Sequence, residues 1–148
     1  MTTIEHTVDV AVPVRTAYNQ WTQFTEFPEF MEGVDQVDQL SDTRTHWKTS
    51  IAGIKREFDA EITDQRPDER IAWQSVGEPH QAGVVAFRFL DPTHTRVALR
   101  MIFAPEGIVE KAGDKTNLIE HRVKGDLDRF KKFIEQRGTE SGGWRGTV

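Results

Sequence analysis

The sequence contains no cysteine, which excludes a disulfide framework, a thiolate zinc site and a cysteine nucleophile. It also has no apolar run of about 18 residues, the length needed to cross a membrane, and its first residues do not resemble a signal peptide. Basic residues do not predominate, because the formal net charge is −5. Such a balance disfavours binding to nucleic acid, since phosphate contacts need a basic surface. We therefore expect a soluble, cytoplasmic protein with neither a membrane span nor a nucleic-acid partner.

Familiar catalytic and cofactor-binding motifs are missing as well. The chain has no HExxH, GxSxG, P-loop or GxGxxG pattern. The histidines lie far apart, without the spacing of paired metal ligands; they are His6, His46, His80, His94 and His121. His80 is either an ordinary loop residue or one that overhangs the mouth of a pocket. We expect no metal and no cofactor, and the catalytic residues, if there are any, stay unknown.

Aromatic residues are present in number, with four Trp and nine Phe in 148 residues. A chain of this length most simply forms one domain, which buries roughly 68–70% of its extended surface. These aromatic side chains must therefore line either a packed core or a cavity.

Alternating apolar and polar residues predict seven strands, at about 3–10, 34–40, 44–51, 55–63, 70–76, 82–90 and 95–104. Turn-forming residues between them favour an antiparallel meander. Helical spacing predicts a short helix after Pro13, a shorter segment around Pro28, and a long amphipathic helix from Pro105 to about Arg137. We predict an α+β fold in which the long helix covers a curled sheet, with one domain at 1–137 and a flexible, Gly-rich tail at 138–148.

The segment GIKREFDAEIT carries three carboxylates at every second position, Glu57, Asp59 and Glu61. Residues two apart on a strand point to the same face. The neighbouring strand at 44–51 places basic residues on its matching face, among them Arg44 and His46. Opposite charges on adjacent strands explain the pattern without catalysis, so we interpret this face as solvated.

The opposite face of the sheet is aromatic and aliphatic, with a few hydroxyl groups. Arg56 is the exception, because the alternation sends its charge toward this apolar side. Either it reaches water or a carboxylate at the strand end, or it orients a ligand. The ligand-binding candidates on this face are Trp47, Thr49, Arg56, Phe58, Trp73, Ser75, Phe87, Phe89, Met101 and Phe103.

Three segments together resemble the START-like helix-grip superfamily (SRPBCC), in its polyketide cyclase/dehydrase and coenzyme Q-binding branch. They are VPVRTAYNQWTQFTEFPEFMEGV, REFDAEITDQRPDERIAW and GDLDRFKKFIEQRG. The resemblance covers residues 3 to about 137 and rests mainly on packing and turn positions.

This resemblance implies a seven-stranded antiparallel curved sheet wrapped around a long C-terminal helix, with two short helices after the first strand and a hydrophobic cavity inside. Members bind polyketides, isoprenoid quinones, lipids or hormones, and some cyclise and dehydrate aromatic polyketides. The aromatase members use an interior arginine and polar groups to orient a carbonyl. Arg56 and the hydroxyl residues are the candidates for such roles here.

Three functions stay open at this point. The first is binding or carriage of a hydrophobic small molecule: a polyketide, an isoprenoid quinone or a lipid. The alternative is a polyketide cyclase/dehydrase of the aromatase type, in which Arg56 stabilises an enolate and Ser75 or Thr49 relays a proton. The third is a protein-interaction module with a filled core, which a structure without a cavity above about 300 Å³ would favour.

Overall fold

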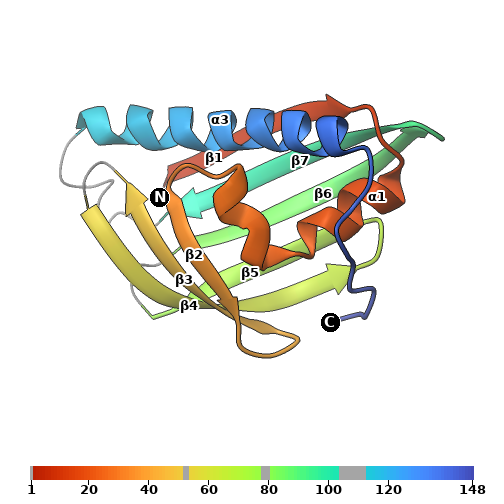
Figure 1. The fold of residues 1–148 in the computed structure, drawn as a ribbon. Coiled ribbons are helices and arrows are strands. Elements are labelled where there is room, and N and C mark those ends of the chain that lie inside the picture. The colour runs from red at the N-terminus through yellow and green to blue at the C-terminus, as the bar shows by residue number, and fades with distance from the viewer. Residues whose placement is uncertain (1, 52–53, 78–80, 104–112) are drawn as a thin grey trace.

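The computed structural model describes the backbone of residues 2–51, 54–77, 81–103 and 113–148. One antiparallel sheet has the spatial order β1-β7-β6-β5-β4-β3-β2 (Figure 1). Strands β2 to β7 form a meander, and β1 pairs with β7 at one edge. The strands are β1 (Thr2–Val10), β2 (Val34–Gln39), β3 (Arg44–Ile51), β4 (Ile54–Arg66), β5 (Arg70–Val76), β6 (Gln81–Asp91) and β7 (His94–Phe103).

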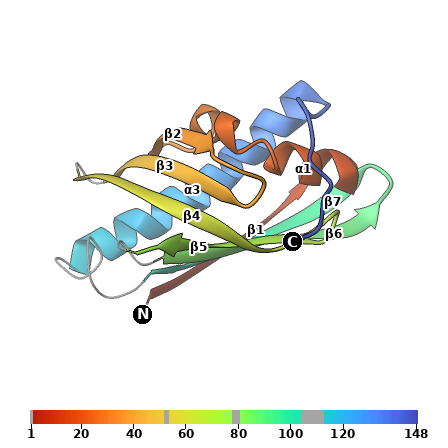
Figure 2. The same cartoon turned by 90° about the horizontal axis from the view of Figure 1, so that it is seen from below.

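The helical segments are α1 (Val14–Trp21), the 3-10 helix η1 (Phe24–Glu29) and α3 (Gly113–Arg137). The long helix α3 lies across the curved sheet, and α1 lies near the C-terminal end of α3 (Figures 1 and 2). The predicted α+β helix-grip fold is therefore confirmed. The part of the long helix predicted before residue 113 lies outside the described residues.

Helix α3 faces the core through an apolar stripe. Val123, Leu127, Phe130 and Ile134 are all buried, and their spacing places them on one side of the helix. Burying a side chain of this kind contributes about 1.5–3 kcal/mol, so the stripe supplies much of the attraction between helix and sheet. Among the described residues, no helix is both long and apolar enough to cross a membrane.

Trp21, the last residue of α1, is the centre of the aromatic core and has no exposed surface. Its ring lies edge-to-face against Phe130 of α3, with 4.8 Å between centroids, and against Phe27 of η1 at 5.5 Å. The ring of Phe87 on β6 lies 6.4 Å away. Pairs of this geometry contribute about 0.5–1.5 kcal/mol beyond the area they bury. A single side chain thus joins both short helical segments, α3 and the sheet.

The outer face of the sheet carries the ion pairs that the sequence predicts. Arg44 lies 3.1 Å from Glu61, and His46 lies between Asp59 at 2.6 Å and Glu57 at 3.1 Å. Within the described ranges, no group of three or more His, Cys, Asp or Glu residues is placed to hold a metal ion. The acidic row of β4 is therefore part of a cross-strand charge network on the surface.

Strand β4 is longer than predicted, and it contains a bulge near its C-terminal end. Its pairing with β5 shifts register between Ile62 and Asp64, and an extra residue in a strand reverses which side chains point inward. Thr63 is consequently exposed, while Ile62 and Gln65 are both buried. Simple alternation would have sent Gln65 to the outer face with the acidic row.

Residues 138–148 lie against the body of the protein and form hydrogen bonds with α1 and β4. Arg145 donates hydrogen bonds to Asp68 and Asn19, both at 2.8 Å. The backbones of Val148 and Gln65 exchange two hydrogen bonds, which places the end of the tail beside β4. The tail runs from the end of α3 past α1 (Figure 1).

The tail glycines are explained by close packing. A Cβ added at Gly143 would lie 2.6 Å from Cγ of Asn19, and one at Gly146 would lie 2.4 Å from Cζ2 of Trp144. Both distances are shorter than real Cβ contacts, so larger residues would push the tail away from α1 or displace its own tryptophan.

The network around His46 leads to a prediction about pH. Hydrogen bonds that the His46 ring donates to the carboxylates of Asp59 and Glu57 raise the pKa of His46 above its ordinary 6.5. Because the pKa of His46 is higher in the folded state than in the unfolded state, protonation of His46 stabilises the fold. This stabilisation is fully present below the unfolded-state pKa of about 6.5 and disappears as the pH rises through the raised folded-state pKa. In urea unfolding from about pH 6 to about pH 9, we expect His46→Gln to remove this part of the fall in unfolding free energy. The exposed His121 is the control: His121→Gln should keep the wild-type slope. An unchanged slope in His46→Gln would contradict the assignment.

Candidate ligand-binding site

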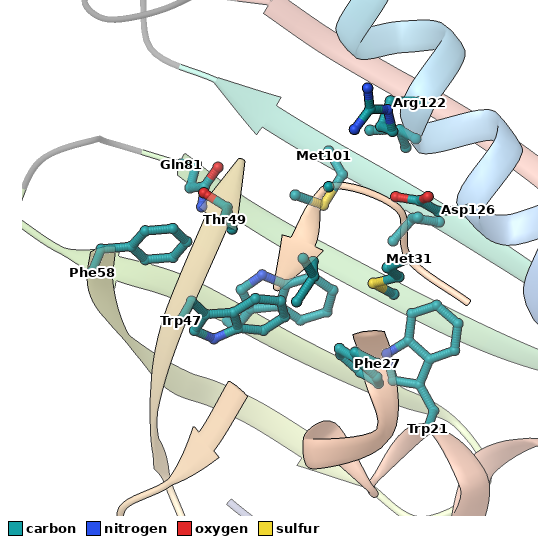
Figure 3. Close-up of a pocket in the computed structure, with 15 residues that line it drawn as sticks. Trp21, Phe27, Met31, Trp47, Thr49, Phe58, Gln81, Met101, Arg122 and Asp126 are labelled. Carbon is teal, nitrogen blue, oxygen red and sulfur yellow. The ribbon is translucent and has the colours of Figure 1, made fainter. Parts of the chain in front are cut away.

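A cavity of about 90 Å³ lies between the sheet and α3. Figure 3 shows its walls, with aromatic side chains on the strand side and polar side chains arriving from α3. The residues that line it are Trp21, Phe27, Met31, Gly33, Val34, Trp47, Thr49, Phe58, Trp73, Gln81, Leu99, Met101, Arg122, Val123 and Asp126.

The aromatic wall is held rigidly in place. The rings of Trp47 on β3 and Phe58 on β4 are stacked, with centroids 6.1 Å apart and planes 6° apart. The two residues are cross-strand partners, and such pairs stabilise a sheet. The indole N–H of Trp47 donates a hydrogen bond to Oγ1 of buried Thr45 at 2.7 Å. This wall therefore presents a fixed, flat apolar surface.

Trp73 on β5 lies over a glycine of the neighbouring strand. A Cβ on Gly83 would lie 2.4 Å from Cζ2 of Trp73 and 2.8 Å from Sδ of Met101. Only a residue without a side chain lets both groups lie across β6. These two side chains occupy space on the sheet that would otherwise enlarge the cavity.

Asp126 is the polar group at the helix side of the cavity. It projects from α3 between Met101 and Met31 (Figure 3), and its side chain is only 12% exposed. Burial raises the pKa of its carboxyl group above the usual 3.8, although hydrogen bonds from Arg129 and from the backbone N–H of Glu32 partly oppose this. A carboxyl group with a raised pKa beside an apolar cavity is able to exchange a proton with a ligand.

Arg122 lies one turn before Asp126 and also lines the cavity. Its Nε is 3.6 Å from a carboxylate oxygen of Glu32, and Nη2 of Arg129 is 3.6 Å from the same oxygen. The polar group of the site thus consists of two guanidinium and two carboxyl groups: Glu32, Arg122, Asp126 and Arg129. A ligand oxygen that reaches it meets both donors and acceptors.

Sequence reasoning missed Asp126 and Arg122. The available signal was the position of Asp126 three residues after Val123 and four before Phe130, which puts a carboxylate on the apolar stripe of α3. A charge on a buried stripe costs free energy unless it is paired, and such residues are candidates for a functional site.

Five of the residues predicted from the sequence line the cavity. They are Trp47, Thr49, Phe58, Trp73 and Met101. The register explains why they meet, because consecutive antiparallel strands bring their inward-pointing positions side by side.

Arg56 does not contact the cavity directly. It lies opposite Thr49 on the same face of the sheet, and Thr49 does line the cavity. The side chain is partly buried, and its Nε has no hydrogen-bond partner among the described residues.

Four other predicted positions have different surroundings. Phe87 is a core residue, 6% exposed, whose ring contacts Tyr18 at 5.4 Å. Ser75 holds a turn, because its hydroxyl donates to the carbonyl of Gly77 and accepts from the N–H of Gln81. Ser75 is not among the residues that line the cavity, and its proton relay stays a prediction. The side chain of Phe103 lies outside the described residues.

The prediction that Phe89 lines the interior is wrong, because this side chain is 59% exposed. Strand β5 begins at Arg70, which pairs with Ala86, so β6 extends beyond its neighbour from residue 87 onward. The register with β7 also shifts between Phe89 and Asp91. Phe89 therefore sits on the part of β6 that projects past β5.

Comparison with known proteins places this fold and cavity in a family. The family model for polyketide cyclase/dehydrase and lipid transport proteins matches residues 10–132. A relative from Streptomyces lincolnensis, an uncharacterised 17.2 kDa protein encoded in the melC2-rnhH intergenic region, is 58% identical over 149 residues and covers 100% of this chain and 99% of its own.

Two solved structures illustrate the likeness of fold. The Zhui aromatase/cyclase of a Streptomyces species matches with a TM-score of 0.78 at 20% identity, over 97% of this chain and 99% of its own. A START superfamily protein from Mycobacterium smegmatis matches with a TM-score of 0.69 at 14% identity, over 92% and 96%. The chain belongs to the polyketide cyclase/dehydrase and lipid transport family and has its START-like helix-grip fold.

Proposed function

We propose that the protein binds a hydrophobic small molecule with a polar end, of the polyketide, isoprenoid quinone or lipid class, in the cavity beneath α3. The observation that carries this proposal is the pairing of an apolar, largely aromatic cavity with a partly buried carboxyl and guanidinium group at its helix side. Ligand sites are mostly apolar with a few placed polar groups, which is the composition found here. We propose that this binding takes place in the cytoplasm.

The ligand would lie with its apolar part on the stacked wall of Trp47 and Phe58. Burial of this part supplies about 25 cal/mol per Å² before the costs of association. A carbonyl or hydroxyl oxygen at the other end would accept a hydrogen bond from Arg122 or from protonated Asp126. A ligand without such an oxygen would leave these groups desolvated and unpaired, which disfavours its binding.

The volume of the cavity limits how this ligand enters. About 90 Å³ is below the volume of about 300 Å³ that separates a ligand site from the filled-core alternative, and below the cavity of about 150 Å³ that holds benzene in an engineered protein, so binding requires this cavity to enlarge. A molecule with several rings therefore needs space that Met31, Met101 or Trp73 occupies. Methionine adapts readily to new shapes, and Trp73 is only partly buried. We propose that Trp73 swings away from Gly83 when the ligand binds.

A second candidate function is the cyclase/dehydrase reaction, and Asp126 is the observation that favours it. As a carboxylate it would take a proton from a carbon between two carbonyl groups, and the resulting enolate carbon would attack another carbonyl to form the new C–C bond. The protonated carboxyl would return that proton to the new alkoxide, and later loss of water would complete the dehydration. Arg122 would stabilise the enolate oxygen, with Arg56 as the alternative donor.

The first test of binding is native mass spectrometry of freshly purified protein, followed by extraction and identification of any released molecule. We expect a stoichiometric hydrophobic adduct. With menadione as a defined quinone probe, Trp47→Ala should weaken binding by about tenfold or more, since it removes a wall of the cavity. Trp144→Ala, outside this cavity, is the matched control. A bare mass together with no menadione binding would favour the filled-core interaction module.

The proposed movement of Trp73 has a kinetic consequence. If the indole must leave Gly83 before a ligand enters, Trp73→Ala should raise the association rate for menadione several-fold in stopped-flow measurements. Trp47→Ala should increase dissociation instead, because that wall contacts the ligand without blocking its path. An association rate that Trp73→Ala leaves unchanged would contradict the movement.

The burial of Asp126 leads to a prediction about how the stability of the protein depends on pH. Because its pKa is raised above 3.8, the folded state holds this proton more tightly than the unfolded state does, and ionisation of Asp126 lowers stability as the pH rises through the raised value. Asp126→Asn should remove that loss in urea unfolding between about pH 3 and about pH 7. The exposed Asp128 provides the control, since Asp128→Asn should retain it. If Asp126→Asn retains the loss as well, the burial of an ionising carboxyl is not its cause.

A further inference from the structure

A second pocket lies at the junction of α1 and η1, and it shares no lining residue with the first cavity. Its volume is about 320 Å³, within the usual range of about 300–1,000 Å³ for small-molecule sites. It is bounded by the α1–η1 junction, the β2–β3 hairpin, the end of β4 and the tail. The described residues that line it are Thr22, Gln23, Phe24, Thr25, Gln39, Asp42, Gln65, Gly143 and Trp144.

The tail supplies one wall of this second pocket. The backbone N–H of Trp144 donates to Oγ1 of Thr22 at 3.0 Å, and two backbone hydrogen bonds join Val148 to Gln65. Arg145 lies 5.6 Å above the ring centre of Tyr18 and pairs with Asp68. Trp144 is thereby held at the pocket edge by contacts on both sides of it in the chain.

Gln65 is the feature that indicates a ligand. The bulge in β4 turns this side chain inward, and only 1% of the residue is exposed. Its Nε2 donates to the hydroxyl of Tyr18 at 3.1 Å, while Oε1 has no partner among the described residues. A buried amide oxygen without a partner costs about 1–3 kcal/mol, a cost that a ligand donor would relieve. Bulges are also over-represented beside functional sites.

The chemistry of the lining defines the ligand class. Of the nine lining residues, none is basic and one, Asp42, is acidic, so anions are disfavoured. The Nε2 groups of the three glutamines and the hydroxyl of Thr22 already have partners within the protein. The three amide oxygens and the hydroxyl of Thr25 are left to face a ligand, and such acceptors suit a molecule with many hydroxyl groups that donate. Asp42 is exposed, and an exposed carboxylate alone contributes little toward holding a cation. Phe24 and Trp144 add apolar surface for the flat side of a ring.

We propose that this second pocket binds a neutral, polyhydroxylated ring, such as a monosaccharide unit, with one ring hydroxyl donating to Oε1 of Gln65. The proposal is independent of the cavity under α3. The ring would lie between the apolar surfaces of Phe24 and Trp144, with its hydroxyl groups directed to the glutamine and threonine side chains.

The test is an NMR titration of the ¹⁵N-labelled full chain with D-glucose and D-galactose. We expect the indole N–H resonance of Trp144 to shift and saturate in the millimolar range with at least one of them. Gln39→Ala should weaken this binding by about three- to tenfold. Gln36→Ala is the matched control, because Gln36 is on the same strand but does not line the pocket. Trp144→Ala should weaken binding by about tenfold or more.

Charged probes separate this proposal from its competitors. D-glucosamine and a glucose phosphate monoester have nearly the same ring with opposite charges. Binding of the amine but of neither neutral sugar would overturn the proposal in favour of a cation site, and preference for the phosphate would overturn it in favour of an anion site. The absence of saturable shifts with both neutral sugars, or equal affinities in wild type and Gln39→Ala, would overturn it too. The resonances of Gln65 and Val148 report whether each variant keeps the tail in place.

Discussion

The structure depends on one geometric constraint: a single helix has to cover the concave face of a wide sheet. A helix with its side chains is about 10–12 Å across, whereas adjacent strands are about 4.8 Å apart, so α3 spans only a few of them. The remainder of the face must be covered by something else. The aromatic cluster around Trp21, carried by α1 and η1, covers part of it, and the space that neither fills is the cavity.

The position of Asp126 follows from the same constraint. A residue on the edge of the apolar stripe of α3 faces the space that the helix does not fill, and there a polar group is tolerated only with partners. Arg129 and the N–H of Glu32 provide these partners, and burial still raises the pKa of the carboxyl group. The same hydrogen bonds join the residues after η1 to α3, so Asp126 also has a structural role in this part of the fold.

The two pockets differ because different elements close them. The cavity under α3 is enclosed by rigid strands and by adaptable side chains such as Met31 and Met101, so its volume depends on rotamers. The second pocket is closed by a tail whose glycines allow it to lie tightly on α1. Its shape therefore depends on whether the tail is docked, and the buried Gln65 connects that docking to the hydroxyl of Tyr18.

The sequence by itself determined the architecture of this protein. A strand or helix that buries one side has apolar residues at a regular spacing, and this spacing can be recognised in the sequence. The strand positions, the outward acidic row with its basic partners and the aromatic interior all followed from that spacing. The inward placement of Gln65, the exposure of Phe89 and the contacts of the tail with α1 and β4 did not. Each depends on a bulge, on the length of a neighbouring strand or on the approach of a distant segment, and none of these leaves a local pattern. The volume of the cavity was likewise decided only by the tertiary structure, since it is set by how far Trp73 and Met101 lie across Gly83.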